Sequence, residues 1–118
     1  MTRKLVLPWP PKVLSPNARA HWATRSRAAK KYRMTCHLLA RQFGAVAPDG
    51  RVLLSLEFCP PDARRRDDDN CVAAFKSGRD GLADALGIDD SRFVTRFEMG
   101  QPVKGGAVVV SIQGEVGE

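Results

Sequence analysis

Carboxylates are concentrated at two places in this chain. Asp67, Asp68 and Asp69 directly follow three consecutive arginines, and Asp89 and Asp90 form a second acidic pair further along. Carboxylates this close together repel one another unless a cation lies among them. Ligand sets made only of oxygen suit Mg²⁺ or Mn²⁺, which accept a few carboxylates together with substrate phosphates. The adjacent arginines indicate an anionic ligand, such as a phosphodiester. The pattern therefore favours metal-assisted cleavage of nucleic acid.

The charge distribution agrees with a polyanionic substrate. The 118 residues carry a net charge of +6, and no Asp or Glu occurs between Met1 and Pro48. Ten Lys or Arg residues lie in that stretch, whereas eight of the thirteen acids lie between Asp62 and Asp90. A basic half beside an acidic group is the layout expected of a protein that holds nucleic acid and acts on it. A soluble basic protein whose charges only solvate it is the alternative.

Other sequence features exclude several classes of protein. The cysteines, Cys36, Cys59 and Cys71, form no C-x-x-C pair, and their odd number argues against a disulfide framework. With two histidines besides, the chain offers no zinc site. No apolar run approaches the ~18 residues of a membrane span. We therefore expect a protein of a reducing cytoplasm, without a membrane partner.

Hydrophobic spacing predicts one small α+β domain over residues 1–118. We expect strands at 4–7 and 52–58, and a helix at 24–43 capped by Thr24. A second helix should follow Asp69 and end near Leu86, with Asp69, Ala73, Lys76 and Asp80 along one stripe. Residues 92–103 and 107–112 should form a hairpin through Lys104-Gly105-Gly106. The predicted order is β-α-β-α-β-β, in one mixed sheet with two main helices.

Three segments of the chain together resemble the RusA family of Holliday-junction resolvases. They are Leu7-Pro8-Trp9-Pro10-Pro11, Arg65-Arg66-Asp67-x-Asp69-Asn70 and Asp89-Asp90-Ser91, and the Lys104-Gly105-Gly106 turn also matches. The resemblance covers about residues 4–113. It implies a small homodimeric Mg²⁺-dependent endonuclease of bacterial or phage origin. Such an enzyme nicks two opposing strands of a four-way DNA junction and leaves 5′-phosphate and 3′-hydroxyl ends.

The resemblance also implies roles for individual residues. Asp67, Asp69 and Asp90 match the metal-binding aspartates, with Mg²⁺ as the cofactor and Mn²⁺ as its substitute. Lys76 corresponds to a lysine that the family needs for catalysis, although it stands about one helical turn later here. Asp68 replaces an apolar residue of the family. A bound Mg²⁺ would activate water and relieve charge on the leaving oxygen. Lys76 would stabilise the transition state, and Asp80 would hold it in position.

A second group of residues is expected to contact DNA. It comprises the arginines before the acidic run and a basic face of the first helix: Arg64, Arg65, Arg66, Arg25, Arg27, Lys30, Lys31 and Arg33. Each group also has a structural alternative. Arg64–Arg66 could be counter-ions of the aspartates, and the cations of the first helix could form a solvated face. Asp67–Asp69 could be a cluster at a helix N-terminus that the helix dipole favours. Trp22 and Tyr32 either stack on bases or pack in the core.

The approximate two-fold symmetry of a four-way junction favours a homodimer with one site per cut strand. The strand 108–110 and the region of Trp9 are candidate interfaces. Two other functions stay open. One is a nuclease for other branched DNA, such as flaps or forks, and the other is a junction-binding protein that has lost turnover.

Overall fold

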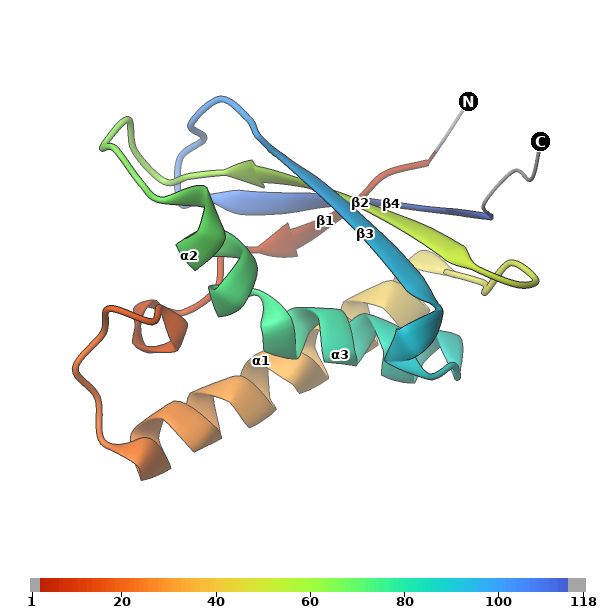
Figure 1. Cartoon of the computed structure of the whole chain (residues 1–118), viewed down its shortest axis with the longest axis horizontal. Coiled ribbons are helices and arrows are strands. Elements are labelled where there is room, and N and C mark those ends of the chain that lie inside the picture. Colours follow the sequence, from red (N-terminus) through yellow and green to blue (C-terminus); the bar gives the residue numbers. More distant parts are fainter. Residues whose placement is uncertain (1–2, 115–118) are drawn as a thin grey trace.

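The computed structural model describes residues 3–114 as three α-helices and a four-stranded mixed sheet, which confirms the α+β class (Figure 1). The helices and the two 3₁₀ turns are η1 (Lys12–Leu14), α1 (Trp22–Phe43), α2 (Asp68–Ala74), α3 (Lys76–Leu86) and η2 (Asp90–Arg92). The strands are β1 (Leu5–Pro8), β2 (Val52–Cys59), β3 (Phe93–Met99) and β4 (Ala107–Gly114). Within the described part of the chain, no helix has the length and apolar character needed to cross a bilayer.

The sheet has the strand order β1-β4-β2-β3. Strands β2 and β3 are parallel, with Val52 opposite Phe93, and β4 runs antiparallel to both β1 and β2. Consequently β1, β2 and β3 all point the same way, and the helices that connect them lie on one face of the sheet (Figure 1). The carboxyl ends of these three strands lie at the same end of the sheet, and open α/β sheets usually bind ligands beyond the carboxyl ends of their strands.

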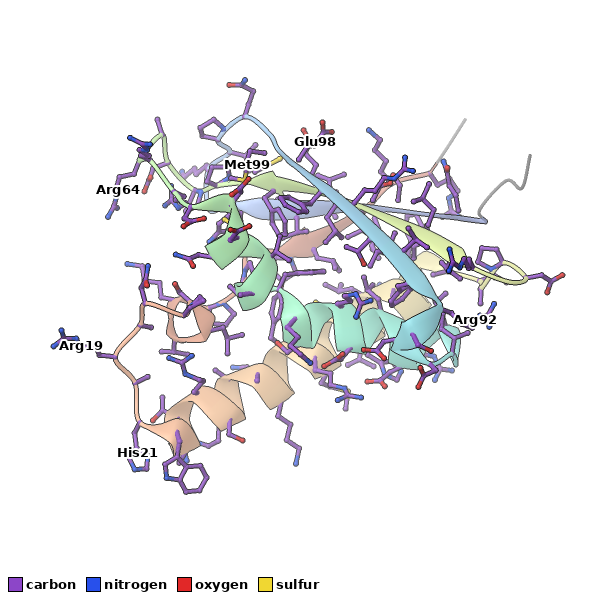
Figure 2. The ribbon with its side chains drawn as sticks, in the orientation of Figure 1. Arg19, His21, Arg64, Arg92, Glu98 and Met99 are labelled. Carbon is purple, nitrogen blue, oxygen red and sulfur yellow. The ribbon has the colours of Figure 1, made fainter. Side chains whose placement is uncertain are left out.

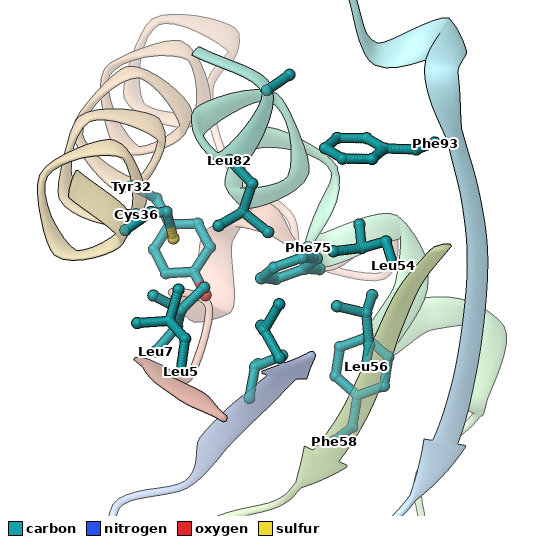
Figure 3. Close-up of a cluster of buried hydrophobic side chains, with 14 of the residues drawn as sticks. Leu5, Leu7, Tyr32, Cys36, Leu54, Leu56, Phe58, Phe75, Leu82 and Phe93 are labelled. Carbon is teal, nitrogen blue, oxygen red and sulfur yellow. The ribbon is translucent and has the colours of Figure 1, made fainter. Parts of the chain in front are cut away.

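The core fills the space between the sheet and helices α1 and α3. Alternate residues of β2, among them Leu54, Leu56 and Phe58, turn inward and meet Phe75 and Leu82 from the helical side (Figure 3). The rings of Phe58 and Phe75 lie edge to face, with centroids 6.0 Å apart. Because the inward residues recur with the period of a strand, the interpretation of 52–58 as a half-buried strand is confirmed.

Helices α1 and α3 approach each other closely at two glycines. A Cβ atom on Gly81 would come within 2.3 Å of the backbone oxygen of Arg33, and one on Gly78 within 2.7 Å of the rings of Tyr32 and Phe75. Glycine weakens an isolated helix, and here the cost is offset by this close packing. All three cysteines are buried free thiols.

Two sequence-based expectations are wrong. Residues 92–103 and 107–112 do not form a hairpin, because β2 lies between β3 and β4. After β3 the chain passes the end of β2, where Gly100 and Val103 donate backbone hydrogen bonds to the carbonyls of Phe58 and Pro60. The expected single helix after Asp69 is divided at Phe75 into α2 and α3. That division interrupts the stripe on which Asp69 and Lys76 were to lie.

The first helix begins slightly earlier than predicted. Its N-cap is His21, whose Nδ1 accepts a hydrogen bond from the backbone N–H of Ala23, and Thr24 lies inside the first turn. The helix ends at Phe43, as predicted, and Gly44 follows with a φ of 84°, a left-handed conformation that glycine adopts without strain.

Candidate functional site

The loop that follows β2 is organised by Asp62. Its carboxylate accepts hydrogen bonds from the backbone N–H of Arg64 at 2.9 Å and from Nη1 of Arg66 at 2.9 Å, and it forms an ion pair with Nη2 of Arg64 at 3.2 Å. Hydrogen bonding to Arg66 is the largest cause that lowers the pKa of Asp62 to about 2, followed by the backbone N–H of Arg64. Arg64 and Arg66 are therefore counter-ions of Asp62, a residue that the sequence interpretation did not single out.

The acidic run forms the amino end of α2. Asp67 is the N-cap, and its Oδ1 accepts a hydrogen bond from the backbone N–H of Asp69 at 3.0 Å. Asp68 and Asp69 occupy the first turn, where the helix dipole favours negative charge. All three side chains are exposed, and each offers a carboxylate oxygen within 4.8 Å of the others. Among the sequence-predicted aspartates, the fold thus brings Asp67 and Asp69 together, with Asp68 between them.

The chemistry of this donor set fits a small hard cation. Opposite ligands of Mg²⁺ are at most about 4.2 Å apart, twice the metal–oxygen distance, so small side-chain rotations would bring these carboxylates into range. The N-capping hydrogen bond uses only one oxygen of Asp67 and leaves the other for a metal. A set made only of carboxylate oxygens suits Mg²⁺ or Mn²⁺.

Asp90 lies away from this group. It opens the turn η2 before β3, whereas Asp67 follows the end of β2. Since β2 and β3 are parallel, the two aspartates lie at opposite ends of these strands, and Figure 1 shows α2 near one end of β3 and the turn η2 at its other end. Oδ2 of Asp90 pairs with Nη1 of Arg79 at 3.2 Å. Within one chain, Asp90 is therefore not a third ligand beside Asp67 and Asp69.

Lys76 occupies the start of α3, directly after the interruption at Phe75. Its Nζ lies 3.6 Å from Oδ2 of Asp80, so the structure places Asp80 where it holds the lysine, as the sequence interpretation supposed. The side chain of Lys76 is 76 % exposed, which leaves its ammonium group accessible to a bound anion. Arg79, one turn further on, was not predicted; it bonds Asp90 and the hydroxyl of Thr95.

A cleft of about 550 Å³ adjoins the acidic group at the carboxyl ends of β1, β2 and β3. The residues that line it include Trp9, Lys12, Arg65, Arg66 and Asp67. A Cβ atom on Gly106 would come within 2.8 Å of the Trp9 side chain, so this glycine lets the indole lie against the backbone. A smaller depression of about 480 Å³ lies beyond, lined by Met99 and by residues 65–68.

Arg65 differs from its two neighbours. It lines both hollows, its side chain is exposed, and it forms no ion pair or hydrogen bond within residues 3–114. Arg66 is held by Asp62 and by two backbone carbonyls, with its guanidinium 6.0 Å from the Trp9 ring. The cleft therefore combines an aromatic wall with one unpaired arginine, which are features of sites for single-stranded nucleic acid.

The basic residues of α1 fall into two groups. Arg25 donates to the carbonyl of Ala18 at 2.8 Å, and Arg33 binds both carboxylate oxygens of Asp84, at 2.7 and 2.9 Å. These two side chains have structural roles. The exposed cations without an ion pair or hydrogen bond among the described residues are Arg27, Lys30 and Lys31 in the first half of the helix and Arg41 in its last turn.

Core packing is confirmed for Tyr32 and is wrong for Trp22. Tyr32 is 4 % exposed and donates its hydroxyl to the carbonyl of Pro8 at 2.6 Å, so it belongs to the core. Trp22 is 75 % exposed at the start of α1, where its ring lies beside that of His21. Figure 2 shows His21 at the tip of this helix, far from α2. Trp22 therefore does not line the cleft, and its ring is exposed on the surface.

Comparison with known proteins adds a relative of undetermined function. No protein-family model matches the chain. It is 47 % identical over 117 residues to an uncharacterized protein of Xylella fastidiosa strain Temecula1, a match that covers 95 % of this chain and 76 % of the relative. The chain therefore belongs to the same family as that protein.

Proposed function

We propose that this protein is a Mg²⁺-dependent endonuclease for branched DNA, and that four-way junctions are its preferred substrate. The observation that carries the proposal is the position of the Asp67–Asp69 carboxylates at the rim of a cleft that contains Trp9 and an unpaired Arg65. The proposal is supported because carboxylate oxygens of a kind suited to Mg²⁺ lie beside an arginine and an aromatic ring, groups suited to phosphate contact and base stacking. We name four-way junctions as the preferred substrate because the motifs resemble those of RusA resolvases. Mn²⁺ is expected to replace Mg²⁺.

The residues of the site have distinct roles in this proposal. When bound, Mg²⁺ supplies Lewis acidity for phosphodiester hydrolysis and lowers the pKa of a coordinated water. Asp67 and Asp69 hold the cation, and the N-capping hydrogen bond fixes the orientation of Asp67. Arg65 binds a phosphate next to the scissile one. Lys76 is a mobile positive charge that Asp80 positions, and it stabilises charge on the phosphate in the transition state.

DNA outside the cleft is held by the outer face of α1. Arg27, Lys30 and Lys31 are exposed there and contact duplex phosphates, whereas Trp9 supports an unpaired base. Because such binding is mostly electrostatic, it should weaken steeply with salt. The protein acts in the bacterial cytoplasm, or in a phage-infected cell, as a homodimer. A dimer would cut both strands of the two-fold symmetric junction.

A second candidate function is junction binding without cleavage. The observation in its favour is that Asp90 pairs with Arg79 at the opposite end of the sheet, so one chain assembles two of the three aspartates that the resemblance assigns to the metal. In that case the only role of the Asp67–Asp69 carboxylates would be to stabilise α2 through their interaction with the helix dipole. A nuclease acting equally on flaps and forks differs from the main proposal in substrate only.

Cleavage of defined DNA structures tests these alternatives. A mobile four-way junction, a flap and a linear duplex of the same sequences are incubated with Mg²⁺ and with the wild type, Asp69→Asn or Asp49→Asn. Asp49 is an exposed loop aspartate away from the cleft and is the matched control for the loss of one charge. The proposal expects paired symmetric nicks in the junction alone, lost in Asp69→Asn and kept in Asp49→Asn.

Each other outcome has a distinct meaning. Tight junction binding without nicks, together with no Mn²⁺ binding by calorimetry, would establish the binding protein. Equal cleavage of all three substrates would remove the junction preference. Full activity of Asp69→Asn would refute the assignment of the metal site.

A further inference from the structure

Strand β3 is an edge strand whose outer side carries free backbone groups. Within the described chain it pairs with β2 alone. The N–H of Gly100 donates to the carbonyl of Phe58 at 2.8 Å, which fixes the direction in which alternate residues point. Residues 94, 96 and 98 therefore direct their backbone groups towards β2. Residues 95, 97 and 99 direct theirs outward, away from the sheet, whereas the N–H of Phe93 already donates to the carbonyl of Asp90.

This edge lacks most of the devices that protect edge strands. Long unprotected edges pair with other strands, and proteins usually shorten them or place proline there. Strand β1, at the other edge, has four residues and ends in Pro8. Strand β3 has seven residues without proline. On its helix-facing side Phe97 and Met99 remain 41 % and 40 % exposed, although large apolar side chains gain stability from burial.

We propose that β3 pairs antiparallel with β3 of a second copy, with the two-fold axis at Phe97. In this register Phe97 and its counterpart exchange both backbone hydrogen bonds, which matches the outward direction of its groups. Thr95 faces Met99 of the other copy in a further hydrogen-bonded pair. The two sheets then continue as one sheet of eight strands, and the exposed Phe97 side chains cover each other across the axis.

The charges on the strand select this register. Arg96 of each copy comes directly opposite Glu98 of the other, at positions without backbone hydrogen bonds, where facing side chains are closest. A shift of the axis to Thr95 would place Arg96 opposite Val94, and Glu98 opposite Arg92, whose guanidinium already donates to the carbonyls of Gly50 and Pro48. Within one chain Glu98 lies beside Glu57 of β2, a pair of like charges for which the second copy's arginine would supply the opposite charge.

Both candidate sites would lie on one side of the joined sheet. Met99, which lines the smaller depression together with Asp67 and Asp68, is two residues from the axis. The two Met99 Cα atoms would be separated by about 13 Å along the strands, from four residues at ~3.3 Å each. The interface itself does not rest on the proposed nuclease function: a dimer without cleavage would refute that function and leave the pairing intact.

Charge reversal on the full-length protein tests the interface. Molar mass is measured by sedimentation over a concentration series for the wild type, Arg96→Glu, Glu98→Arg and the double variant. Each single reversal turns both Arg–Glu pairs into like-charge pairs, so the dimer dissociation constant should rise roughly 10- to 100-fold. The double variant restores opposite charges and should return to within about threefold of the wild type. Both residues are exposed, so folding should be unaffected.

Hydrogen exchange provides an independent measurement on the same proteins. The amides of 95, 97 and 99 should be protected in the wild-type dimer and exchange quickly in either single variant. Those of 94, 96 and 98 should stay protected in every variant, since they bond β2. A wild type that is monomeric at 100 μM, or single variants that dimerise normally, would overturn the proposal. So would a double variant that fails to recover, or protection of 95, 97 and 99 in a monomer.

Discussion

Removing the three exposed cations in the first half of α1 should reduce the salt dependence of DNA binding by a definite amount. The variant replaces Arg27, Lys30 and Lys31 by alanine. All three are exposed and unpaired within residues 3–114, and alanine favours the helix. If each contacts one phosphate, the slope of log binding constant against log salt concentration should become less negative by about 2.7, from ~0.9 per contact.

The size of this effect makes it easy to measure. Between 50 and 200 mM KCl the wild type should lose about 40-fold more affinity than the triple variant, since that is fourfold raised to the power 2.7. Fluorescence anisotropy with a labelled four-way junction, without divalent metal so that no cleavage occurs, gives both slopes. The melting temperature of each protein is measured in parallel to confirm folding.

Arg33→Gln is the matched control. Arg33 is on the same helix, but its charge is already neutralised by the two hydrogen bonds to Asp84. Its loss should change the slope by much less than one contact. An unchanged slope in the triple variant would show that this face does not bind DNA. If Arg33→Gln made the slope less negative by as much as the triple variant does, the division of the basic residues into unpaired and paired groups would be refuted.

Three further predictions concern stability and its pH dependence. Gly81→Ala should destabilise the fold by about 1–3 kcal/mol, because overpacking against the Arg33 carbonyl outweighs a gain of about 1 kcal/mol in helix propensity; a raised melting temperature would contradict this. Asp84→Asn should lower stability at pH 7 by about 0.5–1 kcal/mol and flatten its acid-side decline. Hydrogen bonding to Arg33 lowers the pKa of Asp84, so this contribution to wild-type stability is present above pH ~4 and is lost as the pH falls further. If the stability of both proteins, measured by thermal melting at a series of acid pH values, declined with the same slope, this assignment would be wrong. Tyr32→Phe should cost about 1–3 kcal/mol by leaving the Pro8 carbonyl unbonded. Burial raises the pKa of Tyr32, so stability present at neutral pH should be lost above pH ~10 in the wild type and not in Tyr32→Phe, which alkaline denaturation measures.

Local sequence patterns predicted the elements better than their arrangement. The alternation from Val52 to Phe58 and the helical spacing up to Phe43 both reflect burial against one core, and both are confirmed. The final hairpin was wrong because a glycine turn indicates a change of direction and not which strand lies alongside. In this fold the backbone hydrogen bonds at Gly100 and Val103 carry the chain past β2 before it turns.

The candidate site was predictable where it is local and not where it depends on topology. Asp67 and Asp69 are two residues apart on one helix end, so their proximity follows from the sequence alone. The position of Asp90 depends on the direction of β3 relative to β2, which no local pattern contains. The role of Arg66 depends on Asp62, four residues earlier. Only the folded loop shows that this acid, and not the acidic run, neutralises the arginine.

The central position of β4 has a consequence for biosynthesis. Strand β1 is made first, yet its only neighbour in the described sheet is β4, which comes last of these four strands in the chain. Until residues 107–114 emerge, Leu5 and Leu7 have no strand beside them and their backbone groups remain bonded to water. The sheet can therefore be completed only after residues 107–114 have emerged. A break in the exposed turn near Gly105 would leave two fragments, and adding the β4 peptide to the longer one should restore the fold.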